Sequence, residues 1–216
     1  MTVILAIFTV IISYLLGSIN FAVIFSKAFS HQDIRESGSG NAGTTNVIRV
    51  NGFVPGILTF IFDALKGFAA CKLGEIVFSN FIYPNLNSVL TVRYSGAYLC
   101  AVACIIGHIF PLFFNFRGGK GVATCVGIFT VCCPIAIIIG LIVFALVTLI
   151  SKYVSLGSLV ATVIVVILAT VFRNGETPAA VQIICCLIMG GLIYYKHISN
   201  IKRLLAGKEN KINDKA

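Results

Sequence analysis

Long apolar stretches alternate with short polar segments along the whole chain. The apolar stretches occupy residues 3–25, 55–78, 96–110, 122–150, 159–172 and 178–195, and outside 55–78 they contain no Lys, Arg, Asp or Glu. Because about 20 apolar residues form a helix that crosses a bilayer, this pattern predicts an all-α integral membrane protein. The polar segments are short, so we expect a single transmembrane domain over residues 1–216.

The stretch 122–150 decides how many times the chain crosses the membrane. Its length, with Cys132-Cys133-Pro134 at its middle, allows either one long kinked helix or a hairpin of two short helices. The hairpin gives seven spans and places the loops 26–52, 111–121 and 151–158 and the C-terminal tail on one side. That side then carries 12 of the 16 basic residues: Lys27, Arg35, Arg49, Arg117, Lys120, Lys152, Lys196, Lys202, Arg203, Lys208, Lys211 and Lys215.

Positive charge in short loops marks the cytoplasmic side of a membrane protein. We therefore predict a seven-transmembrane-helix bundle with its N-terminus outside and its C-terminus in the cytoplasm. A single helix over 122–150 would divide the basic residues between the two faces. Of the remaining basic residues, Lys66 and Lys72 lie in the second helix, and only Arg93 and Arg173 fall on the outer side.

Composition agrees with this picture. Mean hydropathy is +1.02 and only 11% of residues are charged, whereas soluble domains carry about 25%. The net charge of +9 lies in the loops, and no arginine-rich or aromatic-interleaved patch indicates a nucleic-acid partner.

The N-terminus has neither a basic region nor a cleavage site, so we expect a first helix and not a signal peptide. The eight cysteines lie in apolar runs and are expected to be packing residues.

The first polar segment, residues 31–52, contains SGSGNAGTTNVIR from Ser37 to Arg49. Gly38, Gly40 and Gly43 alternate there with hydroxyl and amide side chains. Glycine accepts positive φ without steric penalty, and backbone N–H groups that converge in such a run bind anions, phosphate above all. We expect residues 27–52 to form a loop, and we expect this glycine-rich part of it to bind phosphate.

The second polar segment, residues 107–124, contains RGGKGVAT just before a helix. Gly118, Gly119 and Gly121 surround Lys120, and the free N–H groups and positive end of the following helix favour an anion. The run is not a Walker A loop, because Gly follows the lysine where Ser or Thr is required. His108 is expected to brace this loop.

Two further segments complete the predicted site. Residues 151–158 supply Ser155 and Ser158, and residues 196–203 supply His197 and Asn200, which share a face if the last helix continues that far. The four segments hold no acidic cluster, paired carboxylates or cysteine. We therefore expect no metal, no cofactor and no thiol nucleophile. A cationic site of this kind suits a substrate that already carries a good leaving group.

Polar residues inside two apolar stretches have competing interpretations. Asp63 and Lys66 are three residues apart and can pair on one helix face. Charges inside a span indicate function by default, and the alternative is a structural pair that braces the glycine-rich loop. In the first helix, Gly17-Ser18-Ile19-Asn20 allows either a close helix–helix approach or the lining of a polar site.

Three motifs then resemble one family over essentially the whole chain. SGSGNAGTTNVIR, GHIFPLFFNFRGGKGVAT and HISNIKRLLAGKE, with Asp-x-x-Lys-Gly at Asp63 to Gly67, are similar to the bacterial membrane acyl-phosphate:glycerol-3-phosphate acyltransferases, the PlsY family. One departure is Asn20, where the family commonly has a proline-containing turn. The His-x-x-x-x-Asp motif of the other acyltransferase class is absent.

The resemblance implies a seven-helix fold in the bacterial inner membrane with a cytoplasmic active site. It implies transfer of a fatty acyl group from acyl phosphate to the 1-hydroxyl of glycerol-3-phosphate, giving lysophosphatidic acid and phosphate, the first acylation of phospholipid biosynthesis. The implied partners are these two substrates, membrane lipid and the enzyme that forms acyl phosphate.

The resemblance also assigns roles to residues. Ser39, Arg49 and Lys120 would hold phosphate near the reaction centre, and Ser158, His197 and Asn200 would face glycerol-3-phosphate. The residues that would shape the loop are Asn41, Thr44, Thr45 and Asn46. Either His197 or the substrate's own phosphate would take the hydroxyl proton.

A transporter of a phosphorylated metabolite is the main alternative from another class. Intramembrane Asp63 and Lys66 in broken helices would fit it. The absence of an internal repeat and the gathering of polar residues on one face argue against it.

Overall fold

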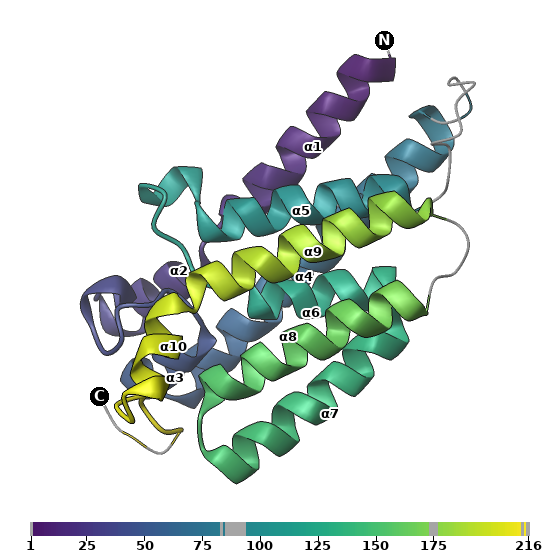
Figure 1. The fold of residues 1–216 in the computed structure, drawn as a ribbon. Helices are drawn as coiled ribbons and strands as arrows, with labels where there is room; N and C mark the ends of the chain where they lie inside the picture. The colour runs from purple at the N-terminus through teal and green to yellow at the C-terminus, as the bar shows by residue number, and fades with distance from the viewer. Residues whose placement is uncertain (1, 83, 85–93, 173–176, 213, 215–216) are drawn as a thin grey trace.

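The computed structural model describes residues 2–82, 84, 94–172, 177–212 and 214. Arg93, Arg173 and Lys215 of the charge count, and most of the polar segments 79–94 and 173–177, lie outside the described residues. The described chain is helical throughout (Figure 1). Its elements are α1 (Thr2–Ser18), α2 (Phe21–Ser30), η1 (Ile34–Glu36), α3 (Thr44–Asn51), α4 (Phe53–Val77), the π-helical turn η2 (Phe78–Ile82), α5 (Ser95–Ile109), η4 (Leu112–Phe114), α6 (Val122–Cys132), α7 (Pro134–Ser151), α8 (Val154–Val171), α9 (Ala179–Lys196) and α10 (Ile198–Leu205).

Six helical stretches are long and apolar enough to cross a membrane. They are α1 with α2, α4 with η2, α5 with η4, α7, α8 and α9. The seventh apolar helix, α6, has 11 residues and reaches about 16 Å, roughly half of a bilayer core. The all-α integral membrane fold is therefore confirmed, while seven complete crossings stay a prediction.

The stretch 122–150 forms a hairpin. Cys133 separates α6 from α7 with φ −158° and ψ 81°, and Pro134 opens α7. At the start of α6, Lys120 contacts Asn200 of α10, and at the end of α7 the carbonyl of Lys152 accepts a hydrogen bond from Ile212 N–H. Both ends of the hairpin therefore meet at α10 and the C-terminal tail, as Figure 1 shows.

The first span is broken at Ile19 and Asn20 and is not the continuous helix expected from the sequence. Asn20 caps α2 by accepting a hydrogen bond from Val23 N–H. A Cβ at Gly17 would overlap the backbone of Cys104 in α5, so the small residue permits the close approach that was one of the two interpretations. The break also leaves the carbonyl of Ile19 free to accept a bond from another helix.

That bond comes from the charged pair of α4. Lys66 Nζ lies 2.7 Å from Asp63 Oδ1 and donates to Ile19 O at 2.7 Å, and both side chains are buried. His108 Nδ1 of α5 lies 3.5 Å from the same carboxylate oxygen. The pair therefore ties α4 to the break between α1 and α2 and to α5, and not to the segment 37–49.

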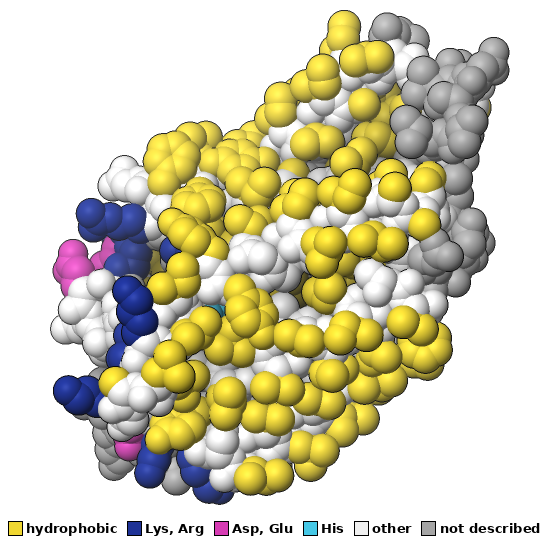
Figure 2. Space-filling model, viewed as in Figure 1, with side chains coloured by type: hydrophobic (Ala, Val, Ile, Leu, Met, Phe, Trp, Pro, Cys, Tyr) yellow, Lys and Arg dark blue, Asp and Glu magenta, His cyan; other side chains and the backbone are white. Residues whose placement is uncertain are grey.

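The surface divides into an apolar belt and a charged end. Apolar side chains cover the sides of the bundle in Figure 2, and the Lys and Arg side chains gather at the end where α3 and α10 lie. All eight cysteines of the described chain are buried and free, as expected for packing residues. This arrangement places the four polar segments at one end of an apolar bundle.

Candidate active site

The first polar segment is a glycine turn held by one asparagine. Gly38 and Gly40 have φ of 59° and 69°, the conformation for which glycine was predicted there. Asn46 Oδ1 accepts from the backbone N–H of Ser39 at 2.9 Å, and its Nδ2 donates to the carbonyls of Ser37 and Ile34 at 3.0 and 3.2 Å. Asn46 is buried, so it fixes the turn from inside while the Ser39 side chain stays exposed.

The second half of this segment is helical, which corrects the expectation of a loop over 27–52. Thr44 and Thr45 lie in the first turn of α3 and Arg49 in its last turn. Asn41 precedes the helix, and its carbonyl accepts from Gly43 N–H. Gly43 has extended φ (−161°) and does not contribute the positive-φ geometry of the other two glycines. Arg49 is therefore carried on a short helix, and its Nε donates to the carbonyl of Asp214 at 3.2 Å.

The glycine loop before α6 packs against the end of α5. The backbone N–H groups of Gly118 and Gly119 donate to the carbonyls of Ile109 and His108, both at 3.2 Å. These two N–H groups are thus engaged within the protein, contrary to the expectation that they are free for an anion. Gly121 has φ of 88° and precedes α6, so Lys120 and the first turn of that helix remain to face a ligand.

The two glycine segments lie against each other. A Cβ at Gly119 would overlap both the carbonyl oxygen of Ala42 and Nε2 of His108. Arg35 Nη1 also donates to the carbonyl of Phe114 at 2.8 Å, and the same guanidinium holds the pKa of Asp33 below its usual value. His108 thus contacts the second loop through its carbonyl and its ring, and its role as a brace stays a prediction.

Lys120 joins the second segment to the fourth. Its Nζ donates to Asn200 Oδ1 at 2.5 Å. Burial above all, together with the cations of Arg203, Lys196 and Arg49 and against the opposing charge of Glu209, lowers the pKa of Lys120 to about 8. The ammonium is thus a charged but partly desolvated group at neutral pH, which makes it a strong partner for a phosphate.

Glu209 is a member of this network that sequence reasoning missed. Its Oε1 accepts from Asn200 Nδ2 at 2.6 Å and from Ser155 Oγ at 3.0 Å, and its Oε2 accepts from Arg203 Nε at 2.7 Å. A carboxylate between the lysines at 208 and 211 of a basic tail is the signal that could have identified it. Ser155 contributes to this network, whereas Ser158 Oγ donates to the carbonyl of Val154 within its own helix.

His197 lies at a bend between α9 and α10, with φ −98° and ψ 3°. It therefore does not share one continuous helix with Asn200, although both are buried. Its Nδ1 lies 2.8 Å from the carbonyl oxygen of Ile193, and since a carbonyl only accepts, Nδ1 carries the proton and Nε2 is the acceptor. Burial, followed by the charge of Lys120, lowers the pKa of His197 to about 4, so the ring is neutral at pH 7.

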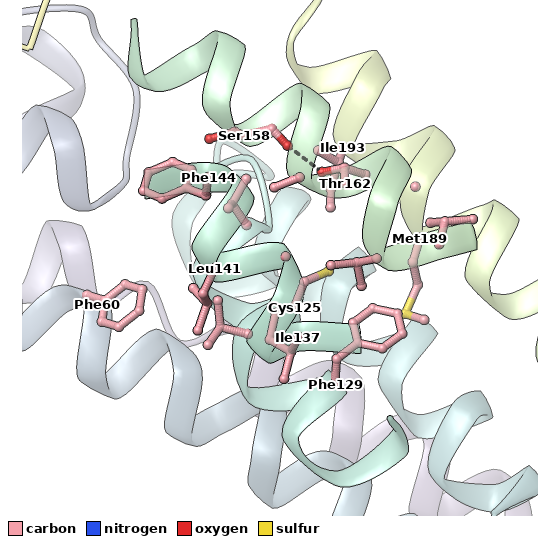
Figure 3. A pocket seen from close by; sticks show the side chains of 17 residues that line it. Phe60, Cys125, Phe129, Ile137, Leu141, Phe144, Ser158, Thr162, Met189 and Ile193 are labelled. Atoms are coloured by element: carbon pink, nitrogen blue, oxygen red, sulfur yellow. Dashed lines mark hydrogen bonds between the residues drawn. The ribbon is translucent and has the colours of Figure 1, made fainter. Parts of the chain in front are cut away.

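An apolar cavity of about 90 Å³, partly open to the surroundings, lies in the bundle (Figure 3), and its lining includes Val122, two residues after Lys120. It is lined by side chains from α4 and α6–α9. Val122 and Ser158 lie at the end near Lys120, and Phe129, Val165 and Met189 lie deeper. Its lining is almost wholly apolar, so the cavity suits a hydrocarbon chain.

These features define a class: a helical integral membrane protein with a basic site, suited to phosphate groups, at the mouth of an apolar cavity. Comparison with known proteins narrows this class. The chain matches the family model of glycerol-3-phosphate acyltransferase over residues 7–207. The glycerol-3-phosphate acyltransferase of Thermoanaerobacter sp. (strain X514) is 42% identical over 97% of each chain. Glycerol-3-phosphate acyltransferase 2 of Bacillus anthracis is 41% identical over 95% of this chain and 98% of that protein.

Solved structures agree. The crystal structure of PlsY, an integral membrane glycerol 3-phosphate acyltransferase, in its glycerol 3-phosphate form matches with a TM-score of 0.81 and 36% identity, covering 95% of this chain and 94% of that one. The lysophosphatidic acid form of PlsY matches with a TM-score of 0.79 and 35% identity. The chain belongs to the glycerol-3-phosphate acyltransferase family of PlsY, which confirms the resemblance drawn from its motifs.

Proposed function

We propose that this protein transfers a fatty acyl group from acyl phosphate to the 1-hydroxyl of glycerol-3-phosphate. The observation that carries the proposal is the partly buried ammonium of Lys120, which donates to Asn200 Oδ1 and lies two residues before Val122 of the cavity lining. This arrangement can hold the phosphate of a donor whose acyl chain lies in the cavity. The PlsY structures in glycerol 3-phosphate and lysophosphatidic acid forms support the acceptor and the product.

The step balances without a further reactant. The hydroxyl oxygen attacks the acyl carbonyl carbon, a new ester bond forms, and the carbon–oxygen bond to phosphate breaks with its electron pair leaving on phosphate. Negative charge grows on the carbonyl oxygen and on the departing phosphate. Lys120 and Arg49 would stabilise this charge, because the N–H groups of Ser39 and Gly40 already donate to Asn46 Oδ1 and to the carbonyl of Ser37. Loss of one such stabilising group typically reduces the rate by about 10²–10³-fold. Ser39 and Thr45 would complete the contacts to phosphate.

The hydroxyl proton goes to the phosphate of glycerol-3-phosphate in this proposal. His197 has a pKa of about 4, so it is a poor proton acceptor, whereas the second pKa of a phosphate monoester is about 6. Nε2 of His197 would instead accept a hydrogen bond and orient the acceptor. Asn200 and Ser158 would lie on the same side of the substrate.

Replacement of His197 by Gln distinguishes between His197 and the substrate phosphate as the group that accepts the hydroxyl proton. The glutamine amide oxygen can still accept a hydrogen bond but cannot take a proton. We expect His197→Gln to keep more than about a tenth of the wild-type kcat, because loss of a true general base typically costs 10²–10⁴-fold. A loss within that range, in a variant that unfolds at the wild-type temperature, would identify His197 as the base.

The membrane placement is part of the proposal. We propose seven crossings in the bacterial inner membrane, with the N-terminus outside and the basic end in the cytoplasm. The hairpin α6–α7 and the basic cluster at one end support it. Because α6 is short, it would cross only with burial in the bundle or local thinning of the bilayer.

The transporter alternative is weaker in the structure. Asp63 and Lys66 bond to each other and to the carbonyl of Ile19, as a structural pair does. Purified protein in detergent, supplied with acyl phosphate and glycerol-3-phosphate, tests the proposal. We expect stoichiometric phosphate and lysophosphatidic acid, and a protein that forms neither is not this enzyme.

A further inference from the structure

A groove on the outside of the bundle adjoins the apolar cavity. The groove lies between α8 and α9, and Thr162, Val166 and Gly190 line both hollows. Figure 2 shows a hollow between these two helices. The outward residues beside it are apolar and exposed, as Leu187 (59%) and Ile167 (51%) show. Only these shared residues therefore separate the cavity from the region that the hydrocarbon of a bilayer occupies.

Two adjacent glycines, Gly190 and Gly191, leave α9 without side chains where it borders the groove. Gly190 lies at the junction, and a Cβ there would already approach Val166 Cγ2 of α8 to 3.1 Å. A Cβ at Gly191 would meet no described atom within 4 Å. Nearer the polar site, Tyr194 closes the space between the helices by donating its hydroxyl to the carbonyl of Leu159 at 3.0 Å. The opening thus begins one helical turn inside the membrane from the basic end.

The depth of the cavity makes such an opening necessary for long chains. The α8 residues that line the cavity run from Ser158 to Val166, over which the helix rises about 12 Å. One leaflet of bilayer hydrocarbon is about 15 Å thick, and a membrane lipid's acyl chain fills it. A chain of that length, with its phosphate end at Lys120, exceeds the cavity.

We propose that the acyl chain passes laterally between α8 and α9, with its distal part in the bilayer, and that Gly190 determines specificity by keeping this route open for long chains. The inference rests on the proposed function. It predicts that the depth of the cavity does not limit the length of the acyl chain that the enzyme accepts. A long-chain donor can enter from the membrane, and a long-chain product can leave into it, without the chain passing through water.

The test narrows the gap from each helix separately. Gly190→Leu adds bulk from α9 and Val166→Phe adds bulk from α8. Ile184→Phe is the matched control, because Ile184 is exposed (55%) on α9 and lines neither hollow. Each purified variant is assayed with octanoyl phosphate and with hexadecanoyl phosphate, and the ratio of kcat/KM for the long donor to that for the short donor is compared with wild type.

We expect this ratio to fall about tenfold or more in both gap variants, the scale on which steric fit in an apolar pocket discriminates, and to stay at the wild-type value in Ile184→Phe. An unchanged ratio in either gap variant that still uses octanoyl phosphate would overturn the inference. The octanoyl reaction also reports whether a variant is folded. Failure of wild-type protein with both donors would refute the proposed function instead, so the two failures are distinguishable.

Discussion

The charge of Lys120 makes the proposed chemistry dependent on pH. Burial lowers the pKa of its ammonium from 10.5 to about 8, a shift equivalent to about 3 kcal/mol of differential stabilisation between its two protonation states. The cation is the form that binds phosphate, and it is present below this pKa and lost above it. We therefore expect kcat/KM, which reports the free enzyme, to decrease above pH 8.

Replacement by Arg tests this reasoning. Arginine keeps its charge throughout the accessible pH range, so Lys120→Arg should lose the decrease near pH 8. Its maximal activity should be lower than that of wild type, because a planar guanidinium does not reproduce the position of the ammonium. One pH unit above its pKa, wild type should retain about a tenth of its plateau kcat/KM, while the Arg variant should remain at its own plateau.

The assay is phosphate release from acyl phosphate between pH 6 and pH 10, with the uncatalysed hydrolysis subtracted and the unfolding temperature measured at each pH. Lys152→Arg serves as the control, because Lys152 is exposed on the same end of the molecule and its hydrogen bonds within the described residues come from its backbone N–H and carbonyl. This variant should keep the wild-type profile. A decrease that stays near pH 8 in Lys120→Arg would assign it to another group and refute the account of Lys120.

Three further predictions concern the scaffold and the topology. Asn46→Ala should abolish most activity and lower the unfolding temperature, because each buried backbone partner left unpaired costs about 1–3 kcal/mol; unchanged activity would show that the turn at Ser39 is not needed. Asp63→Ala should lower the free energy of unfolding by about 3–5 kcal/mol, because it leaves Lys66 unpaired. The double variant Asp63→Ala with Lys66→Met should recover much of this loss in denaturant unfolding. An equal loss in the single and the double variant would show that the ion pair does not stabilise the fold. Single cysteines at Pro134 and Ser151 should react with an impermeant maleimide from opposite sides of oriented membranes, and labelling from one side would contradict the seven-span topology.

Much of the fold was predictable because burial in lipid imposes a simple pattern. Long apolar stretches identified the spans, and Cys132-Cys133-Pro134 marked the reversal between α6 and α7. The positive φ of Gly38 and Gly40 followed from their place in a polar turn. In each case a local property of the sequence determines the backbone.

The features that were missed depend on contacts between distant segments. Residues 44–51 contain Thr, Thr and Asn, which are weak helix formers, yet they form α3 because Asn46 and Val47 are buried against the rest of the site. The N–H groups of Gly118 and Gly119 donate to carbonyls at the end of α5. No local sequence pattern indicates these hydrogen bonds. Glu209 became recognisable only when its partners on α8 and α10 were placed beside it.

The central claim is that the basic site and the apolar cavity together perform acyl transfer from acyl phosphate. The most direct measurement follows the purified protein with hexadecanoyl phosphate and glycerol-3-phosphate, quantifying released phosphate and lysophosphatidic acid together, beside Lys120→Ala. We predict equal amounts of both products from wild type and a rate lower by about 10²–10³-fold in the variant. Phosphate without lysophosphatidic acid, or a folded Lys120→Ala protein with the wild-type rate, would contradict it.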